Sequence, residues 1–362
     1  MSSFEYTFPA VRGLQAGREY YIAMLPLSLL AKLFSSEQEI EYLPPEFRAQ
    51  RVLNEARIPE ITNYILQNRN NYVFSSLSAS INGNIKFTPN SELSELGTLS
   101  VPMDTTFLLN DGQHRKAAII RALAEDKTLE KETISVVFFK DEGIERAQQM
   151  FTDLNKHAVK TSKSLSTLYD NRNELAKATY EIIKSNPFFK NYTDLEKDNL
   201  GKNSSNFFTL ANLYNANKLI MKTEKCNTKD KAFLKNFWNE ICNNITEWQE
   251  VMNKEITKKD LRENYILTLG ITISSFGRLG RYFFENKNID IKSKLNKLKK
   301  INWKRNNEKD WLNRTIGTNG RIINNETSIM LTCSRIKQLI GIPLNKEEQE
   351  KEASLEKINN AD

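Results

Sequence analysis

The sequence is poor in the residues that build disulfides and metal clusters. Its 362 residues include three cysteines and two histidines, and no cysteine has a second cysteine or a histidine at zinc-finger spacing. We therefore expect neither a disulfide scaffold, nor a structural zinc, nor a histidine-rich metal site, and so few cysteines favour the reducing cytoplasm. No apolar run approaches the ~18–20 residues of a membrane span, and the first residues lack the basic-then-apolar pattern of a secretory signal.

Charge is unevenly distributed along the chain. Lys plus Arg number 52 and Asp plus Glu number 45, a net charge of +7. Residues 1–175 carry 19 basic and 22 acidic residues, whereas residues 176–362 carry 33 and 23. The segment 287–337 alone holds 13 basic and 4 acidic residues. Such a local excess is typical of proteins that bind a phosphate-rich polymer. The alternative is a solvated lysine-rich surface, which the lysines of 292–300 fit equally well.

Hydrophobic periodicity predicts an α+β first half and a mostly helical, basic second half. We place the domains at 1–165 and 166–362. Apolar runs predict strands at 20–24, 72–74, 77–81, 85–87, 106–109 and 134–139, with Asn82-Gly83 as a hairpin turn into 85–87. Helical spacing predicts helices at 27–34, 49–66, 113–125, 143–154, 261–284 and 328–340, successive helices from 163 to 242 broken at Pro187, and a charged helix or frayed end from 346.

The segment most suited to chemistry is 106–124. A predicted strand runs through Asn110-Asp111-Gly112 directly into a helix whose first turn contains Gln113, His114 and Arg115. The first backbone N–H groups of a helix, with the positive end of its dipole, form a natural anion site. Arg115 would grip a phosphate with a bidentate fork, and His114 would donate to it or exchange a proton near neutral pH.

The same residues also allow a purely structural interpretation, in which Asp111 caps the helix and Arg115 pairs on the surface. Alternatively, Asp111 orients His114 or helps to hold a metal ion. A strand, a glycine and a helix alone favour the structural interpretation. Consecutive His and Arg residues in the first turn favour a phosphate site.

A second polar segment contains the other histidine. A predicted helix ends at Asn155, and Lys156 and His157 follow. We expect Asp153, Asn155, Lys156 and Lys160 to line the same cleft as residues 110–115. The alternative is a capped helix end with solvated lysines.

These two segments resemble the boxes of a known group of proteins. Residues 111–115 resemble the DGQHR motif, and residues 151–155 resemble the second box of the same group. A helix that opens on Gly-x-His-Arg-x-x-Ala after a strand is similar to the ParB and sulfiredoxin superfamily. Within the DGQHR group, the chain resembles the DndB family, which regulates bacterial DNA phosphorothioation clusters, and 276–281, 301–305 and 319–322 also resemble that family.

The resemblance implies a ParB/sulfiredoxin-like first domain and a repressor that binds double-stranded DNA at the promoter of its own cluster. It implies that the turn binds the phosphates of a nucleotide or a related anion, through Asn110, Gly112, Gln113, Arg115, Asp153, Asn155 and Lys156. Six basic residues of the second half are candidate DNA contacts: Arg278, Arg281, Lys304, Arg305, Arg314 and Arg321. Trp303 and Trp311 are expected to pack in the core or to stack on nucleic acid.

The competing hypothesis is enzymatic. A ParB-like pocket with Asp111, His114 and Arg115 as catalytic residues would hydrolyse a nucleoside triphosphate, with Mg²⁺ as cofactor, or a phosphodiester. No Walker A motif is present, so any nucleotide site would differ from a P-loop. A third interpretation is a scaffold that docks onto other phosphorothioation proteins, for which the charged segment 346–357 is a hint. The sequence leaves open whether the chain forms a homo-oligomer.

Overall fold

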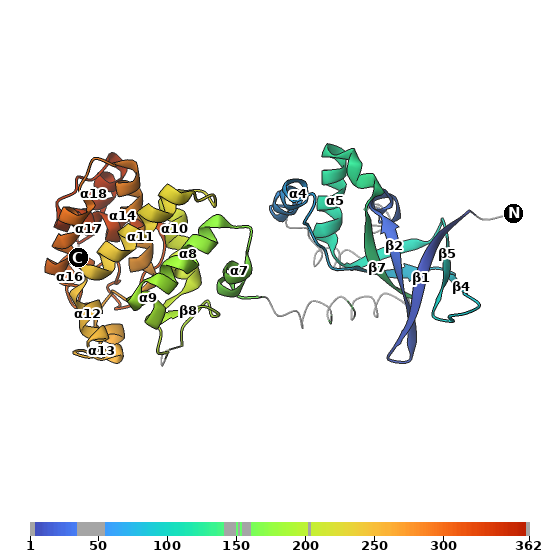
Figure 1. Ribbon diagram of the computed structural model, residues 1–362, viewed down its shortest axis with the longest axis horizontal. Helices are drawn as coiled ribbons and strands as arrows, with labels where there is room; N and C mark the ends of the chain where they lie inside the picture. The colour runs from blue at the N-terminus through green and yellow to red at the C-terminus, as the bar shows by residue number, and fades with distance from the viewer. Residues whose placement is uncertain are drawn as a thin grey trace. The chain divides into compact units, whose positions relative to one another are not determined.

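The chain forms two compact units, Met1–Val159 (unit 1) and Lys160–Asp362 (unit 2) (Figure 1). The structure is a computed structural model that describes residues 4–34, 55–140, 150, 153, 161–201 and 204–359. Unit 1 combines a sheet with helices and unit 2 is mostly helical, so the α+β class and the helical second half are confirmed. The boundary predicted at residue 165 lies a few residues beyond the end of unit 1.

Seven strands in the described part of unit 1 form one mixed sheet. Their order is β4-β5-β1-β2-β7-β3-β6, and β3 and β7 are parallel neighbours. β6 lies at the edge of this sheet, so the chain that follows it can leave the sheet without crossing another strand. The strands are β1 (Glu5–Gln15), β2 (Arg18–Pro26), β3 (Leu77–Asn82), β4 (Lys86–Pro89), β5 (Leu96–Pro102), β6 (Thr106–Asp111) and β7 (Thr133–Lys140).

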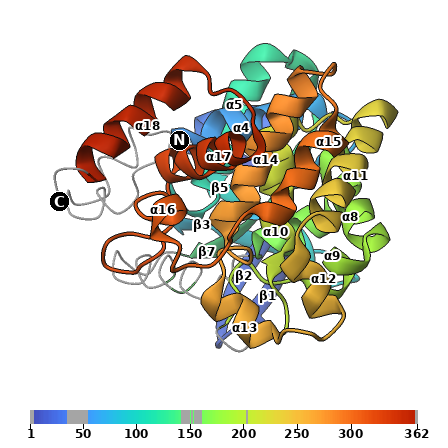
Figure 2. The ribbon, with the colours of Figure 1, turned by 90° about the vertical axis from the view of Figure 1, so that its left-hand side faces the viewer.

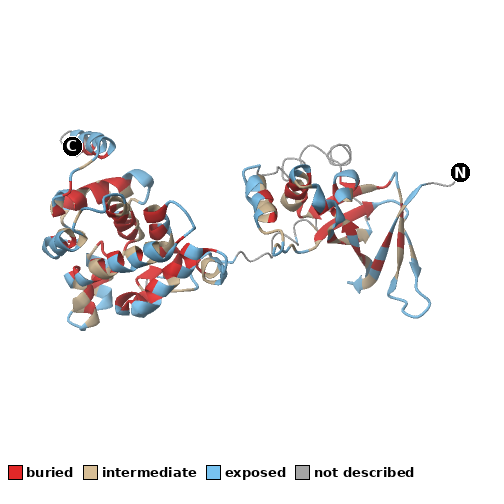
Figure 3. Ribbon diagram, turned by 45° about the horizontal axis from the view of Figure 1, so that its top comes forward, coloured by how far each residue is buried: buried red, intermediate tan, exposed pale blue. Residues whose placement is uncertain are grey.

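Helices cover one face of the sheet. Alternate strand residues such as Leu77 and Phe138 share a buried core with Ile119 and Ala122 of α5, as the period of two in a strand requires. α4 lies beside α5 (Figure 1), and residues 14–19, where β1 turns into β2, are exposed (Figure 3). The helical elements are η1 (Leu27–Leu29), α1 (Leu30–Leu33), α4 (Arg57–Gln67), α5 (Gln113–Glu125) and η2 (Lys127–Lys131).

Two predictions for the sheet are wrong. The chain at 72–74 is not a strand, because the rings of Tyr72 and Phe74 pack against each other and Phe74 packs on Tyr64 of α4. The turn at 82–83 does not close a hairpin either: β3 pairs with β6 and β7, whereas β4 pairs with β5. β5, which lies between the edge strand β4 and β1, was not predicted, because it contains few β-branched residues.

Unit 2 is built mainly from helices. None of the described helices in the chain is both long and apolar enough to span a membrane. Its elements are α7 (Lys163–Tyr169), α8 (Glu174–Ser185), α9 (Pro187–Tyr192), β8 (Thr193–Asp194), β9 (Phe208–Thr209), α10 (Leu210–Met221), α11 (Thr228–Asn243), α12 (Thr246–Met252), α13 (Lys258–Asn264), α14 (Gly270–Glu285), α15 (Ile291–Leu295), η3 (Asn296–Lys300), α16 (Glu308–Trp311), α17 (Glu326–Ile340) and α18 (Lys346–Asn359).

The core of unit 2 contains four fully buried tryptophans. Trp303 and Trp311 stack on each other, with ring centroids 5.4 Å apart, and are 1% and 0% exposed. Both therefore serve packing, which is the interpretation that the sequence favours for each, and the alternative of stacking on nucleic acid is wrong. α14 packs closely on α10 (Figure 2), where Gly277 meets the backbone of Ala216.

The helical predictions for unit 2 need one correction. The helix expected at 261–284 is two helices, because the chain between α13 and α14 is drawn into a bridge between Tyr265 and Lys304. Pro187 begins α9, where its missing N–H costs no hydrogen bond. The charged segment from 346 is the helix α18. The helix predicted at 143–154 lies almost wholly outside the described residues.

Replacing Gly277 by alanine should destabilise unit 2. A Cβ there would lie 2.7 Å from the carbonyl oxygen of Ala216, and a backbone atom cannot rotate away. The overpacking should exceed the gain from alanine's helix propensity, for a net loss of about 1–2 kcal/mol in urea denaturation. Gly270→Ala on the same helix is the control, since its nearest atom lies at 3.6 Å. Equal stability of the two variants would contradict this packing.

Candidate functional site

The turn from β6 into α5 has the backbone of an anion site. Gly112 is the N-cap of α5, with φ 100° and ψ 18°, and no side chain caps the helix. A Cβ at Gly112 would lie 2.3 Å from Cδ2 of Leu77 and 3.2 Å from Nη2 of Arg115. Both the left-handed backbone and the close approach therefore require glycine. The first N–H groups of a 13-residue helix are left without a side-chain cap at this point.

Arg115 is held by protein groups on several sides. Its Nη2 donates to a carboxylate oxygen of Asp111 at 2.6 Å, and its Nη1 donates to the carbonyl oxygens of Ser75 and Ser76 at 2.6 and 3.1 Å. The side chain is 16% exposed. Arg115 thus ties the first turn of α5 to the segment before β3. Asp111 does not cap the helix. It pairs with Arg115, and the structural interpretation predicted that Arg115 would be paired.

His114 lies in the same turn beside a cation that the motif does not contain. Burial lowers the pKa of the His114 imidazole, and the positive charge of Arg57 lowers this pKa further. Arg57 begins α4, which packs on α5 through the Thr62 hydroxyl and the Ala118 carbonyl oxygen at 3.4 Å. The lowered pKa favours a neutral imidazole at pH 7. Because Arg57 is far away in the sequence, no spacing rule could have found it.

Asn110 is the extra residue of a β-bulge. The β3–β6 register passes from Ser78↔Asp111 to Ala79↔Leu109, so Asn110 has no partner across the ladder. Its side chain is fully buried and donates to the Ser80 hydroxyl at 2.7 Å. The Asn110 Oδ1 atom and the Ser78 Oγ atom are buried and have no hydrogen-bond partner. Bulges often re-aim side chains next to functional sites, and unsatisfied buried atoms suit a water or a ligand.

The second predicted segment is largely beyond what the structure describes. Asp153 is helical and exposed. Asn155, Lys156 and Lys160 lie outside the described residues, so their placement at the turn stays a prediction. Gln113 is half-buried in the first turn of α5. No group of three His, Cys, Asp or Glu side chains among the described residues could hold a metal ion.

The six predicted DNA contacts do not form one surface. Arg314 is 6% exposed and makes a buried ion pair with Glu352, so it cannot reach a phosphate, and its prediction as a DNA contact is corrected. Arg281 is half-buried; it pairs with Glu285 at 2.6 Å and donates to the Ile220 carbonyl oxygen at 3.0 Å.

The remaining four residues differ in exposure. Arg278 is half-buried on α14, and Lys304 and Arg321 are exposed. Arg305 is half-buried and lines a groove of about 1090 Å³. Ile322, the neighbour of Arg321, borders the same groove. The structure thus brings Arg305 and the chain around Arg321 together and leaves Arg314 in the interior.

This groove, which we call the basic groove, is lined by Lys258, Lys259, Arg262 and Arg305. Its lining contains one acidic residue, Glu263. The three cations of α13 were not predicted as DNA contacts, because they lie outside the basic segment 287–337. The Tyr265–Lys304 bridge and a hydrogen bond from the Arg305 N–H to the Asn264 carbonyl oxygen at 2.8 Å bring them beside Arg305.

The two arginines of the basic groove are bonded to neutral atoms. Arg262 donates to the carbonyl oxygens of Ser204, Asn206 and Gly201 at 2.6, 3.3 and 3.2 Å. Arg305 donates to the carbonyl oxygens of Tyr265 and Arg262 at 3.1 and 2.6 Å.

Neither arginine makes an ion pair with a carboxylate within the described residues. Burial lowers the pKa of Arg305, and the more distant Glu263 offsets only part of this shift. The groove therefore keeps a net positive charge, because among the described residues its lining has four cations against the single carboxylate of Glu263.

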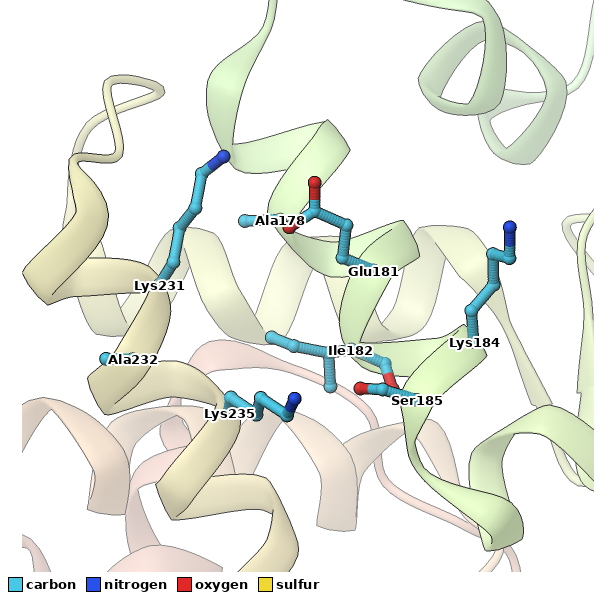
Figure 4. A pocket seen from close by; sticks show the side chains of 8 residues that line it. All are labelled: Ala178, Glu181, Ile182, Lys184, Ser185, Lys231, Ala232 and Lys235. Carbon is cyan, nitrogen blue, oxygen red and sulfur yellow. The ribbon is translucent and has the colours of Figure 1, made fainter.

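A smaller basic cleft lies between α8 and α11 (Figure 4). Its volume is about 470 Å³, and Lys184, Lys231 and Lys235 stand around the apolar Ile182. Glu181 is in the same lining. These lysines come from exposed or half-exposed helix positions, so this cleft carries surface charge of the same sign as the basic groove.

The comparisons with known proteins identify the family. The model of the DndB family, described as DNA-sulfur modification-associated, matches residues 8–343. The chain belongs to the DndB family. No curated protein and no solved structure matches the chain.

Membership of the DndB family connects both units to DNA sulfur modification. The match includes the turn at 110–115 and all four cations of the basic groove. It ends before α18, the helix that supplies Glu352. The likeness to the ParB and sulfiredoxin superfamily stays a prediction.

The imidazole of His114 should titrate below the ordinary histidine pKa of ~6.5. Arg57→Ala should raise this pKa only part of the way, since burial is the larger cause. Because the folded-state pKa of His114 lies below its unfolded value, its contribution to the free energy of unfolding is fully present above the unfolded pKa. This contribution is lost as the pH falls through the folded-state pKa.

NMR titration can follow His114 directly, because the chain has two histidines and His114→Asn identifies its signal. Arg121→Ala, which removes an exposed cation of α5, is the control and should leave the His114 pKa unchanged. A His114 pKa that does not respond to Arg57→Ala would refute the proximity of the two side chains.

Proposed function

We propose that this protein is a DNA-binding regulator that represses a bacterial DNA phosphorothioation gene cluster. Its family is associated with DNA sulfur modification, and the basic groove supports duplex DNA as the ligand. The expected partner is the promoter of its own cluster. Contacts with other phosphorothioation proteins and a homo-oligomer remain predictions.

The single observation that carries the proposal is the uncompensated charge of the groove. Half-buried arginines are normally stabilised by carboxylates, but Arg262 and Arg305 are bonded to backbone carbonyl oxygens. Carbonyl dipoles orient these guanidinium groups without neutralising them. Lys258 and Lys259 add two exposed cations beside them. A phosphate-rich polymer supplies the missing negative charge and releases counterions when it binds.

Two further features add to the positive surface at the groove. Thr268 and Leu269, which line the groove, directly precede α14, a 16-residue helix with no side-chain cap. The positive end of that helix dipole adds to the groove charge. The exposed Arg321 extends the basic surface past Ile322, beyond the groove itself. Phosphate contacts in the groove would position DNA, and Arg321 is our candidate for contacting a base.

Removing the two groove lysines should weaken duplex binding for every sequence alike. For Lys258→Ala/Lys259→Ala, we expect the slope of log affinity against log salt to fall by about 2, because two phosphate contacts are lost. Fluorescence anisotropy with a labelled duplex over a series of salt concentrations measures this slope.

The matched control is Lys231→Ala/Lys235→Ala, which removes two lysines from the smaller cleft of Figure 4. This control should change the slope of log affinity against log salt far less than Lys258→Ala/Lys259→Ala does. If both double variants lower affinity and slope equally, general surface charge explains binding and the groove has no special role.

The turn at Gly112 supports a second function, binding of a phosphate group such as that of a nucleotide. The supporting features are the left-handed Gly112, the uncapped first turn of α5, and the unpaired Asn110 Oδ1 and Ser78 Oγ atoms. Because Arg115 is already held, the first N–H groups of α5 are the better candidates for touching the anion, and His114 lies in the same turn. Hydrolysis by Asp111, His114 and Arg115 stays a separate hypothesis.

Calorimetry with inorganic phosphate and with ATP should detect binding that His114→Ala weakens and Arg121→Ala preserves, since both residues lie on α5 and only the first belongs to its first turn. Phosphate release, with and without DNA, then separates binding from hydrolysis. Absence of binding to either anion by the unaltered protein would contradict the second function.

A further inference from the structure

The segment that carries Arg321 is a loop closed by its own backbone. Ile316 forms bridges with Leu312 and with Ile322, and the Gly317 N–H donates to the Arg321 carbonyl oxygen at 2.8 Å. Arg321 and Ile322 are exposed at its outer end. We call residues 312–323 the basic loop. Its outer end borders the basic groove, so its position decides where Arg321 stands relative to the groove.

The inner end of the basic loop is fixed by a buried ion pair. Arg314 Nη2 lies 2.5 Å from Glu352 Oε2, and Arg314 Nε donates to Oε1 at 3.3 Å. The two side chains are 8% and 6% exposed. Next to Arg314, the Thr315 hydroxyl contacts the Thr332 hydroxyl of α17 at 3.0 Å. Two-point pairing of this kind sets the direction as well as the distance of the guanidinium.

The anchoring carboxylate comes from α18, which lies beside α17 (Figure 2). Glu348, Glu352 and Leu355 are its buried residues among those whose exposure is described, spaced on one helical face. Glu348 accepts a hydrogen bond from Lys337 Nζ at 2.6 Å, also in the interior. The buried face of α18 therefore contains two ion-paired carboxylates as well as the apolar Leu355. Its partners, Arg314 and Lys337, both belong to the family-matched range, whereas α18 does not.

We infer that Arg314 and Glu352 are a positioning pair, through which α18 holds the basic loop so that Arg321 contacts DNA beside the basic groove. This inference rests on the proposed DNA-binding function. Arg314 itself does not touch DNA, because its guanidinium is buried and occupied. The residue that the sequence suggested as a DNA contact acts instead through a neighbour seven residues further along.

Glu352→Gln tests the pair by removing only its charge. The buried Arg314 loses its counter-charge, so the basic loop should loosen and duplex affinity should fall about tenfold, as for Arg321→Ala. If the pair acts through Arg321, combining the two substitutions should cause little further loss. Glu356→Gln, an exposed acid on the same helix, should bind as the unaltered protein does. Fully additive losses, or equal losses for Glu352→Gln and Glu356→Gln, would overturn the inference.

A second variant separates a folding defect from a specific loss of DNA binding. Arg314→Met/Glu352→Leu replaces the whole pair by apolar side chains and leaves no unpaired buried charge. We expect it to keep its helical circular dichroism and to bind DNA within about threefold of the unaltered protein. A loss as large as that of Arg321→Ala, in a folded variant whose 312–323 amides exchange as slowly as in the unaltered protein, would mean that Arg314 contacts DNA directly and would overturn the positioning role.

Hydrogen exchange without DNA separates this inference from the proposed function. In Glu352→Gln, amides of 312–323 should exchange at least about tenfold faster than in the unaltered protein, while those of β7 keep their rates. If no variant binds DNA but the loop exchanges faster, the anchoring holds and the DNA-binding function fails. Unchanged exchange in the loop would overturn the anchoring, whatever the DNA measurements give.

Discussion

The structure of unit 2 depends on how its partly buried cations are compensated. A cation removed from water must be stabilised by a carboxylate or by oriented dipoles, because its lost hydration is worth several kcal/mol. Arg314 and Lys337 have carboxylates from α18, and their charge is cancelled in the interior. Arg262 and Arg305 have only carbonyl oxygens, which orient a guanidinium and leave its charge in place. Cations paired with carboxylates therefore stabilise the fold, whereas cations bonded to carbonyl oxygens give the groove its positive potential.

The same constraint shapes the turn in unit 1. Arg115 is satisfied by Asp111 and by the backbone before β3, so it fixes the entry of the chain into α5. In the proposed phosphate site, this leaves the first amides of α5 as contacts, with the imidazole of His114, whose pKa is lowered by burial and by Arg57, in the same turn. A site built from dipoles and a neutral imidazole suits reversible phosphate contact better than a permanent ion pair would.

The local parts of this architecture could be predicted from sequence, and the tertiary parts could not. The strand, glycine and helix at 106–125 follow from residues adjacent in the chain, and α5 has the predicted bounds. Arg57 and the lysines of α13 reach their sites only through helix packing and the Tyr265–Lys304 bridge. Counting charge located the basic segment, but a count cannot tell an exposed Arg321 from a buried Arg314, because burial depends on the distant Glu352.

The helix α18 shows most clearly why composition misleads here. Fourteen residues rich in Glu and Lys would normally be taken for a solvated tail, yet Glu348 and Glu352 are among the most buried acids of the chain. Breaking one buried ion pair by removing a partner costs about 3–5 kcal/mol, against a typical total stability of about 5–15 kcal/mol. Two such pairs make α18 an integral part of unit 2. Arg314 belongs to the same loop as Arg321. The stability of unit 2 and the geometry of its proposed DNA surface therefore depend on the same carboxylate, that of Glu352.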